Sequence, residues 1–214
     1  MATGLKLFLT GSLVVVSLVS AILRGYAWHW LLFAGLFVSF FADAMLAEYP
    51  PVARKVRDPF VAGMGLFSVV QVLYCAAFWK SVVGMPALYM RRPGALLGMD
   101  FVGSLLPVYL LFGVLFWVLV VFRAQKPLEL KVAVLLYAEL LSAMAALACA
   151  AAFAGIVFAW PLILGGALFM VSDAFIALNL FQDRFPDRVR YERAVWATYF
   201  PAQLLLCLGA SWLY

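Results

Sequence analysis

Residues 167 to 181 spell "ALFMVSDAFIALNLF", an apolar run interrupted by one charged residue, Asp173. Apolar and small residues continue on both sides of the aspartate, and the next basic residue along the chain is Arg184. A run of this composition is typical of a helix that spans a membrane. A charged side chain at the bilayer centre costs about 2.5–3.5 kcal/mol on insertion scales. We therefore expect Asp173 to face the interior of a protein, and we treat it as a candidate functional residue.

The composition of the whole chain supports a membrane location. Of its 214 residues, 68% are hydrophobic and 12% are charged, whereas soluble domains carry about 25% charged residues. The apolar runs are continuous and close to the roughly 20 residues that cross a bilayer, and they do not alternate as the strands of a membrane barrel would. The sequence therefore predicts an all-α integral membrane protein, built as a polytopic helical bundle.

Seven apolar segments are candidate spans, and the prediction is about seven spans, or eight. The segments cover residues 5–23, 28–47, 60–79, 101–122, 130–150, 157–181 and 194–213. Proline resists helix continuation, and prolines are therefore expected to separate the spans at Pro50, Pro51, Pro86, Pro93 and Pro186. Pro161 fits the first turn of the sixth span. We expect one transmembrane domain over residues 1–214, without an inserted soluble domain.

The basic residues divide unequally between the two predicted sides of the membrane. Most of the 15 Lys and Arg residues fall on the side of the N-terminus, namely Lys6, Arg54, Lys55, Arg57, Arg123, Lys126, Lys131, Arg184, Arg188, Arg190 and Arg193. Cytoplasmic loops are enriched in such residues. We therefore predict a cytoplasmic N-terminus, in a bacterial inner membrane. The net charge of +5 is explained by this topology, and nucleic acid is not an expected partner.

Polar residues within the spans gather at one predicted depth. At about 1.5 Å rise per residue, five spans place polar side chains in the cytoplasmic half of the bilayer, at Ser39, Asp43, Gln71, Tyr137, Glu139, Ser142, Ser172, Asp173, Asn179, Thr198, Tyr199 and Gln203. The lone histidine, His29, lies in the opposite half beside two tryptophans. Spacings of three and four residues let these polar groups face inward, as for Ser39 with Asp43 and for Tyr199 with Gln203.

Two interpretations of these polar residues remain open. Hydroxyl groups in spans commonly bond their own helix, and this structural interpretation is favoured for Ser39, Ser68, Ser142 and Thr198. For Gln71, Tyr74 and Glu139, packing and function are equally supported. For Asp43 and Asp173 a functional role is favoured, because amides and hydroxyls could join helices without burying two acids.

The available side chains restrict the chemistry. One histidine and three dispersed cysteines (Cys75, Cys149 and Cys207) provide no metal-ligand spacing, and we expect no metal and no cofactor, although an all-carboxylate site from Asp43, Glu139 and Asp173 is conceivable. Two carboxyl groups in a pocket of low dielectric favour a state in which one holds a proton and the other accepts one. This arrangement suits a hydrolysis that needs both a delivered proton and an activated water.

Several segments resemble signature segments of the YhhN-like lysoplasmalogenase family. They are "FVSFFADAML" (37–46), "LFSVVQVLYCAAF" (66–78), "VLLYAELLSAM" (134–144), "GALFMVSDAFIALNLF" (166–181) and "ATYFPAQLL" (197–205). The last two are the most specific, through Ser172-Asp173 and through Thr198, Tyr199, Ala202 and Gln203. The resemblance extends from about residue 30 to the C-terminus. In this chain Ala42 replaces the family's usual glycine before the first aspartate, and family members are usually drawn with eight spans.

The resemblance implies an integral membrane enzyme that cleaves the vinyl-ether bond of lysoplasmalogens, releasing a fatty aldehyde and a glycerophospho-base. Asp43 and Asp173 would supply the acid/base chemistry. Nine further residues would bind the lysophospholipid or order water, namely Gln71, Tyr74, Tyr137, Glu139, Ser172, Asn179, Thr198, Tyr199 and Gln203. Its phosphate would lie near Arg54, Arg57, Arg184 or Arg188, although topology alone also explains these arginines. The alternative is a non-enzymatic transporter or lipid-binding protein that uses its buried acids for protons or headgroups.

Overall fold

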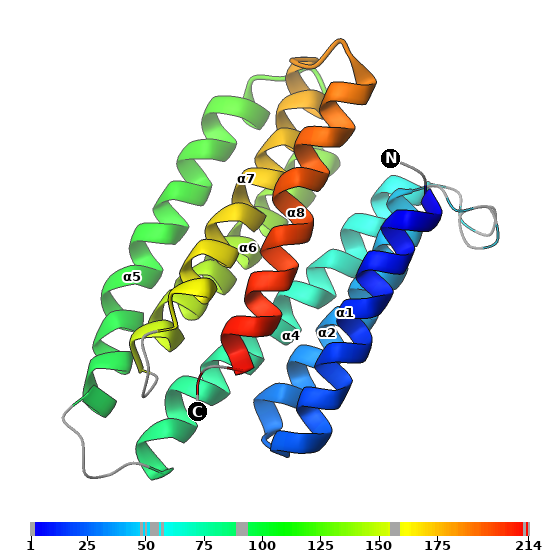
Figure 1. Ribbon diagram of the computed structural model, residues 1–214. Coiled ribbons are helices and arrows are strands. Elements are labelled where there is room, and N and C mark those ends of the chain that lie inside the picture. Colours follow the sequence, from blue (N-terminus) through cyan, green and yellow to red (C-terminus); the bar gives the residue numbers. More distant parts are fainter. Residues whose placement is uncertain are drawn as a thin grey trace.

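The computed structural model describes residues 3–47, 49, 51, 56, 58–88, 94–154, 159–211 and 213, and it describes the side chains of these ranges except 85–88 and 94–98. Within these residues the fold is all-helical (Figure 1). The elements are α1 (Thr3–Arg24), α2 (Ala27–Leu46), α4 (Pro59–Leu88), α5 (Gly94–Trp117), the π-helical segment η1 (Val118–Phe122), α6 (Leu128–Ala154), α7 (Trp160–Gln182) and α8 (Arg188–Ser211).

In the described part of the chain, seven helices are long and apolar enough to cross a membrane. The predicted class, a polytopic helical bundle, is confirmed, and the seven helices correspond to the seven predicted spans. The last helix begins earlier than predicted, at Arg188. The reason is local, because Asp187 Oδ1 accepts hydrogen bonds from the backbone nitrogens of Val189 (2.9 Å) and Arg190 (3.2 Å) and so caps the first turn.

One predicted helix end is wrong. Pro86 was expected to lie between spans, but it lies inside α4, and Pro107 and Pro201 lie inside α5 and α8. Proline is tolerated in membrane helices because neighbouring groups satisfy the backbone positions that it frees. The expectation for Pro161 is confirmed, since it occupies the first turn of α7. The predicted loop residues Pro50 and Pro93, together with Arg54, Lys55 and Arg57, lie outside the described residues.

The helices form one packed series. Contacts join α1 to α2, α2 to α4, α4 to α6, α6 to α7 and α7 to α8, while α5 packs on α6 and α8 also touches α1 and α2. Figure 1 shows α1 and α2 on one side of the bundle and α5 to α8 on the other. Helices α7 and α8 approach closely at Gly165, which has no side chain. A Cβ added there would lie only 3.0 Å from Leu206 N and 3.1 Å from Ala202 O. Small residues are expected at such contacts between membrane helices.

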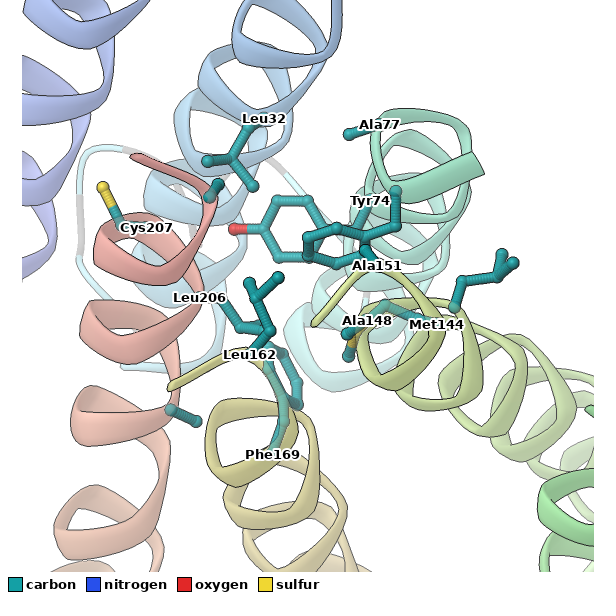
Figure 2. Packing of buried hydrophobic residues seen from close by; sticks show 14 of the residues in the cluster. Leu32, Tyr74, Ala77, Met144, Ala148, Ala151, Leu162, Phe169, Leu206 and Cys207 are labelled. Atoms are coloured by element: carbon teal, nitrogen blue, oxygen red, sulfur yellow. The ribbon is translucent and has the colours of Figure 1, made fainter. Parts of the chain in front are cut away.

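The core is centred on Tyr74, which is fully buried. Its ring lies among Leu32 of α2, Ala151 of α6 and Leu206 of α8, and its hydroxyl points toward α8 (Figure 2). A tyrosine in such a core needs a partner for its hydroxyl, and that partner belongs to the polar network described below.

One end of the bundle holds the N-terminus of α1 and the turn between α7 and α8, and we call it the basic end (top of Figure 1). The described Lys and Arg residues that lie in or next to the helix turns at this end are Lys6, Arg123, Lys126, Lys131, Arg184, Arg188, Arg190 and Arg193. Which side of the membrane this end faces stays a prediction.

Candidate functional site

A cavity of about 880 Å³ opens into the bundle at the basic end. Its wall includes residues from every described helix and from η1, and it is largely apolar, with Phe60, Phe112, Phe116 and Phe181 among its lining residues. Ligand pockets in proteins usually measure about 300–1,000 Å³. The cavity is therefore large enough for a small molecule or for the polar portion of a lipid with part of its chain.

Asp43 of α2 and Asp173 of α7 both line this cavity. The Asp43 side chain is buried, with 4% of its surface exposed, and its Oδ2 accepts a hydrogen bond from Tyr199 Oη at 3.0 Å. Lys6 and Thr10, both on α1, lie close enough to Asp43 to interact with it electrostatically. Side chains from two other helices, α1 and α8, therefore surround this carboxyl group.

A buried network holds Tyr199 in place. Tyr74 Oη donates to Gln203 Oε1 at 2.7 Å. Gln203 Nε2 in turn donates to Ser39 Oγ at 2.9 Å and to Tyr199 Oη at 3.0 Å. The Ser39 and Tyr199 oxygens are 2.8 Å apart, and because the single Tyr199 proton goes to Asp43, Ser39 is the donor in that pair. The network therefore has a direction, from Tyr74 toward Asp43.

Asp173 has a separate partner. Tyr137 Oη of α6 donates a hydrogen bond to Asp173 Oδ2, and both residues line the cavity. Gln71 of α4 approaches the Tyr137 phenol. Gln71 is fully buried, and neither atom of its amide has a hydrogen-bond partner among the described residues. Each aspartate is thus held by a tyrosine from another helix, and the two arrangements share the cavity.

The remaining predicted site residues divide into two groups. Ser172 and Asn179 line the cavity, and Ser172 Oγ also donates to Val195 O at 3.3 Å. Thr198 does not line it, because its hydroxyl donates to the carbonyls of Ala194 and Val195 in its own helix, both at 3.0 Å. Glu139 does not line it either, and its Oε1 is buried without a hydrogen-bond partner among the described residues. Gln71, Tyr74 and Gln203 lie behind the cavity wall.

The sequence reasoning missed a charged cluster at the mouth of the cavity. Lys6 is only 7% exposed, and its Nζ lies 3.3 Å from Glu192 Oε2 and 5.2 Å from the ring centre of Trp196. Arg188 Nε lies 3.2 Å from Glu192 Oε1, and all four residues line the cavity. The sequence pattern identifies Lys6 only as a topology signal. The sequence does contain one clue that Lys6 faces the bundle. Its spacing to Thr10 and Ser17 places all three residues on one face of α1, and the structure shows that this face is buried.

No three His, Cys, Asp or Glu side chains come together as a metal site within the part of the chain that the structure describes. The three cysteines are free thiols, and Cys149 and Cys207 are buried. The chemical groups that face the cavity are therefore carboxyls, phenols, an amide, hydroxyls and the charged cluster.

Fold and site together define a multi-pass helical membrane protein with a large, mostly apolar cavity, which is lined by the carboxyl groups of Asp43 and Asp173 and, at its mouth, of Glu192. The chain belongs to the YhhN family, whose family model matches residues 1–210. No curated protein and no solved structure matches the chain. The resemblance noted in the sequence is thereby confirmed at the level of the family.

Proposed function

We propose that this protein is a lysoplasmalogenase, a hydrolase of the vinyl-ether bond in 1-alkenyl-2-lyso-glycerophospholipids. Membership of the YhhN family supports this assignment. The observation that carries it is the presence of Asp43 and Asp173, from two different helices, in the wall of one cavity. The mostly apolar wall can accommodate an alkenyl chain, and the carboxyl groups can supply the acid that cleavage of the vinyl-ether bond requires.

The proposed reaction begins with proton transfer from the protonated aspartate to the vinyl carbon that is remote from the ether oxygen. The product is an oxocarbenium ion, and an ionised carboxylate stabilises such a cation electrostatically. Water then adds to the carbon bonded to oxygen and gives its proton to a carboxylate, which forms a hemiacetal. Collapse of the hemiacetal returns a proton to the glycerol oxygen and releases the aldehyde. One water is consumed, and both acids regain their starting states.

In this proposal the two tyrosines position the two acids. Tyr199 holds Asp43 through a bond of 3.0 Å, and Tyr137 holds Asp173. Ser172 and Asn179 line the cavity and would contact the substrate or the attacking water. Tyr74 and Gln203 would act from behind the wall by fixing Tyr199, and Gln71 would order water or substrate next to Tyr137. The lipid would enter from the membrane leaflet at the basic end, which the positive-inside rule assigns to the cytoplasm.

The experiment is aldehyde release from a synthetic lysoplasmalogen by the purified protein in heavy water. Since the proton on carbon comes from solvent through an aspartate, the aldehyde should carry one deuterium at its second carbon after immediate reduction to the alcohol. The saturated 1-alkyl ether of the same chain length is the matched control, because it lacks the double bond that accepts the proton. Tight binding of both lipids without aldehyde would reject the proposal and favour a lipid-binding protein.

A further inference from the structure

The charged cluster at the cavity mouth has no role in the reaction as proposed above. It consists of Lys6 of α1 and Arg188 and Glu192 of α8, next to the indole of Trp196. Lys6 is the buried cation of this cluster, since its side chain is 9% exposed, whereas that of Arg188 is 84% exposed. Burial of a lysine carries a large desolvation cost, so its place in the cavity wall calls for an explanation.

Lys6 has more hydrogen-bond donors than its bond to Glu192 uses. An ammonium has three N–H donors, and the side-chain bond found for Lys6 is the one to Glu192 Oε2 at 3.3 Å. Because Lys6 lines the cavity, its further donors are available to a bound molecule. The neighbouring Trp196 ring, 5.2 Å away, stabilises the cation electrostatically and offers no lone pair to its N–H donors.

The sign of the cluster favours an anion. Within the cluster itself, Lys6 and Arg188 contribute two positive charges and Glu192 one negative charge, so these three residues carry one net positive charge. Two other cations at the basic end are engaged elsewhere, since Arg190 pairs with Asp187 at 3.2 Å and Lys131 Nζ donates to Phe122 O at 2.9 Å. Among the described residues, Lys6 and Arg188 are the basic residues that line the cavity.

We propose that Lys6, assisted by Arg188, binds the phosphate of a lysophospholipid in this cavity. The inference rests on the proposed function for the identity of the lipid. Lys6 also lies close to Asp43, and in a lysoplasmalogen the glycerol backbone connects the phosphate to the vinyl ether. A phosphate held at Lys6 therefore brings the reacting bond toward the two acids, and the site selects phospholipids over neutral ether lipids.

Equilibrium binding tests this selection without turnover. The probes are 1-O-alkyl-2-lyso-glycerophosphocholine, the 1-O-alkylglycerol of the same chain length, and inorganic phosphate. We expect the wild-type protein to prefer the phospholipid over the alkylglycerol by about tenfold or more, as a charge-assisted hydrogen bond to phosphate would give. Lys6→Met should reduce this ratio by about tenfold, whereas Lys6→Arg should retain most of it.

Arg188 and Arg190 provide a matched pair of exposed cations in the first turns of α8, with side-chain exposures of 84% and 85%. Arg188→Met should lower the ratio about two- to threefold, less than Lys6→Met because exposed charges are screened. Arg190→Met should leave it unchanged. Since Arg188 is exposed, its variant keeps the proposal testable if Lys6→Met fails to fold.

An unchanged ratio in both Lys6→Met and Arg188→Met would overturn the proposal, as would a wild-type protein without preference for the phospholipid. Displacement of the phospholipid by inorganic phosphate at equal concentration would also overturn it, because the site would then take a free anion. The two proposals fail separately. Aldehyde release with an unmoved ratio rejects the phosphate site alone, whereas the expected ratios without aldehyde release reject the lysoplasmalogenase assignment alone.

Discussion

Tyr199 of α8 donates a hydrogen bond to Asp43 of α2 at 3.0 Å, and this bond joins two helices that make few other contacts. The Tyr199 ring is held on three sides by edge-to-face contacts with Phe67, Phe169 and Trp196, at ring-centre distances of 5.8, 5.5 and 5.4 Å. Ring and hydroxyl are thus fixed independently. The Tyr199 hydroxyl is therefore already in position to donate to Asp43 before a ligand binds, and no rearrangement of the tyrosine is needed.

Replacement of Tyr199 by phenylalanine should separate these two functions. Tyr199→Phe keeps the ring contacts and removes the donor to Asp43, so we expect kcat for aldehyde release to fall about 10–100-fold, the range for loss of alignment. Tyr137→Phe, which removes the donor to Asp173, should have an effect of similar size. Steady-state kinetics of the two variants measure this. Full activity in both would show that the phenols do not position the acids.

Replacement of Gln203 by leucine should weaken the fold. Gln203→Leu leaves the hydroxyls of Tyr74, Ser39 and Tyr199 without the amide that joins them. Unsatisfied buried polar groups cost about 1–3 kcal/mol each, so the free energy of unfolding in detergent should fall by at least that amount. Gln182→Leu is the control, because that side chain lies at the end of α7 and makes longer bonds, at 3.3 and 3.4 Å through its amide nitrogen and an exposed one at 3.2 Å from Arg184 Nε to its amide oxygen. Equal stability of the two variants would contradict the network's structural role.

The close packing of α7 on α8 should not tolerate a side chain at Gly165. In Gly165→Ala the new methyl would lie 3.0 Å from Leu206 N and 3.1 Å from Ala202 O, and backbone atoms cannot move aside as a flexible side chain can. Overpacking of this kind costs about 1–3 kcal/mol, which should lower the thermal unfolding temperature in detergent. Gly103→Ala in α5 has open space around the added Cβ and should unfold at the wild-type temperature or above it.

Two predicted substrate-binding residues should behave differently when their polar groups are removed. Asn179 lines the cavity, so Asn179→Leu should raise KM for the lysophospholipid about tenfold, the loss of one hydrogen bond to a substrate. The Thr198 hydroxyl bonds its own helix, so Thr198→Val should change KM less than twofold. The same kinetic assay measures both. A larger change in KM for Thr198→Val than for Asn179→Leu would contradict the claim that Asn179, and not Thr198, contacts the substrate.

The bundle and the depth of its polar residues could be predicted because both depend on position along a helix. Apolar runs indicate where spans lie, and residues equally far from a helix end share a height, which is how Asp43 and Asp173 were singled out together. The partners of these acids could not be predicted, since the pairing of Tyr74 with Gln203, or of Tyr137 with Asp173, depends on helix order and rotation about each axis. Neither is encoded in the hydropathy pattern.

Lys6 shows a different limit. A lysine near the start of a span has the same sequence signature whether it points to the lipid headgroups or into the bundle. Only the packing of α1 beside α8 brings Lys6 to Glu192 at 3.3 Å and makes it part of the cavity wall. Glu192 and Arg188 lie before the predicted start of the last span, and they join the site because the Asp187 cap starts α8 early.

The most direct measurement is aldehyde release by Asp43→Asn, by Asp173→Asn and by the double variant, each confirmed as folded by its unfolding temperature. The expected result is a loss of about 10²–10⁴-fold in kcat for each single variant. The double variant should be little worse than the poorer single one, because groups that act in the same step are not additive. Retention of wild-type turnover by both single variants would contradict the central claim that these two carboxyl groups act together in one cavity.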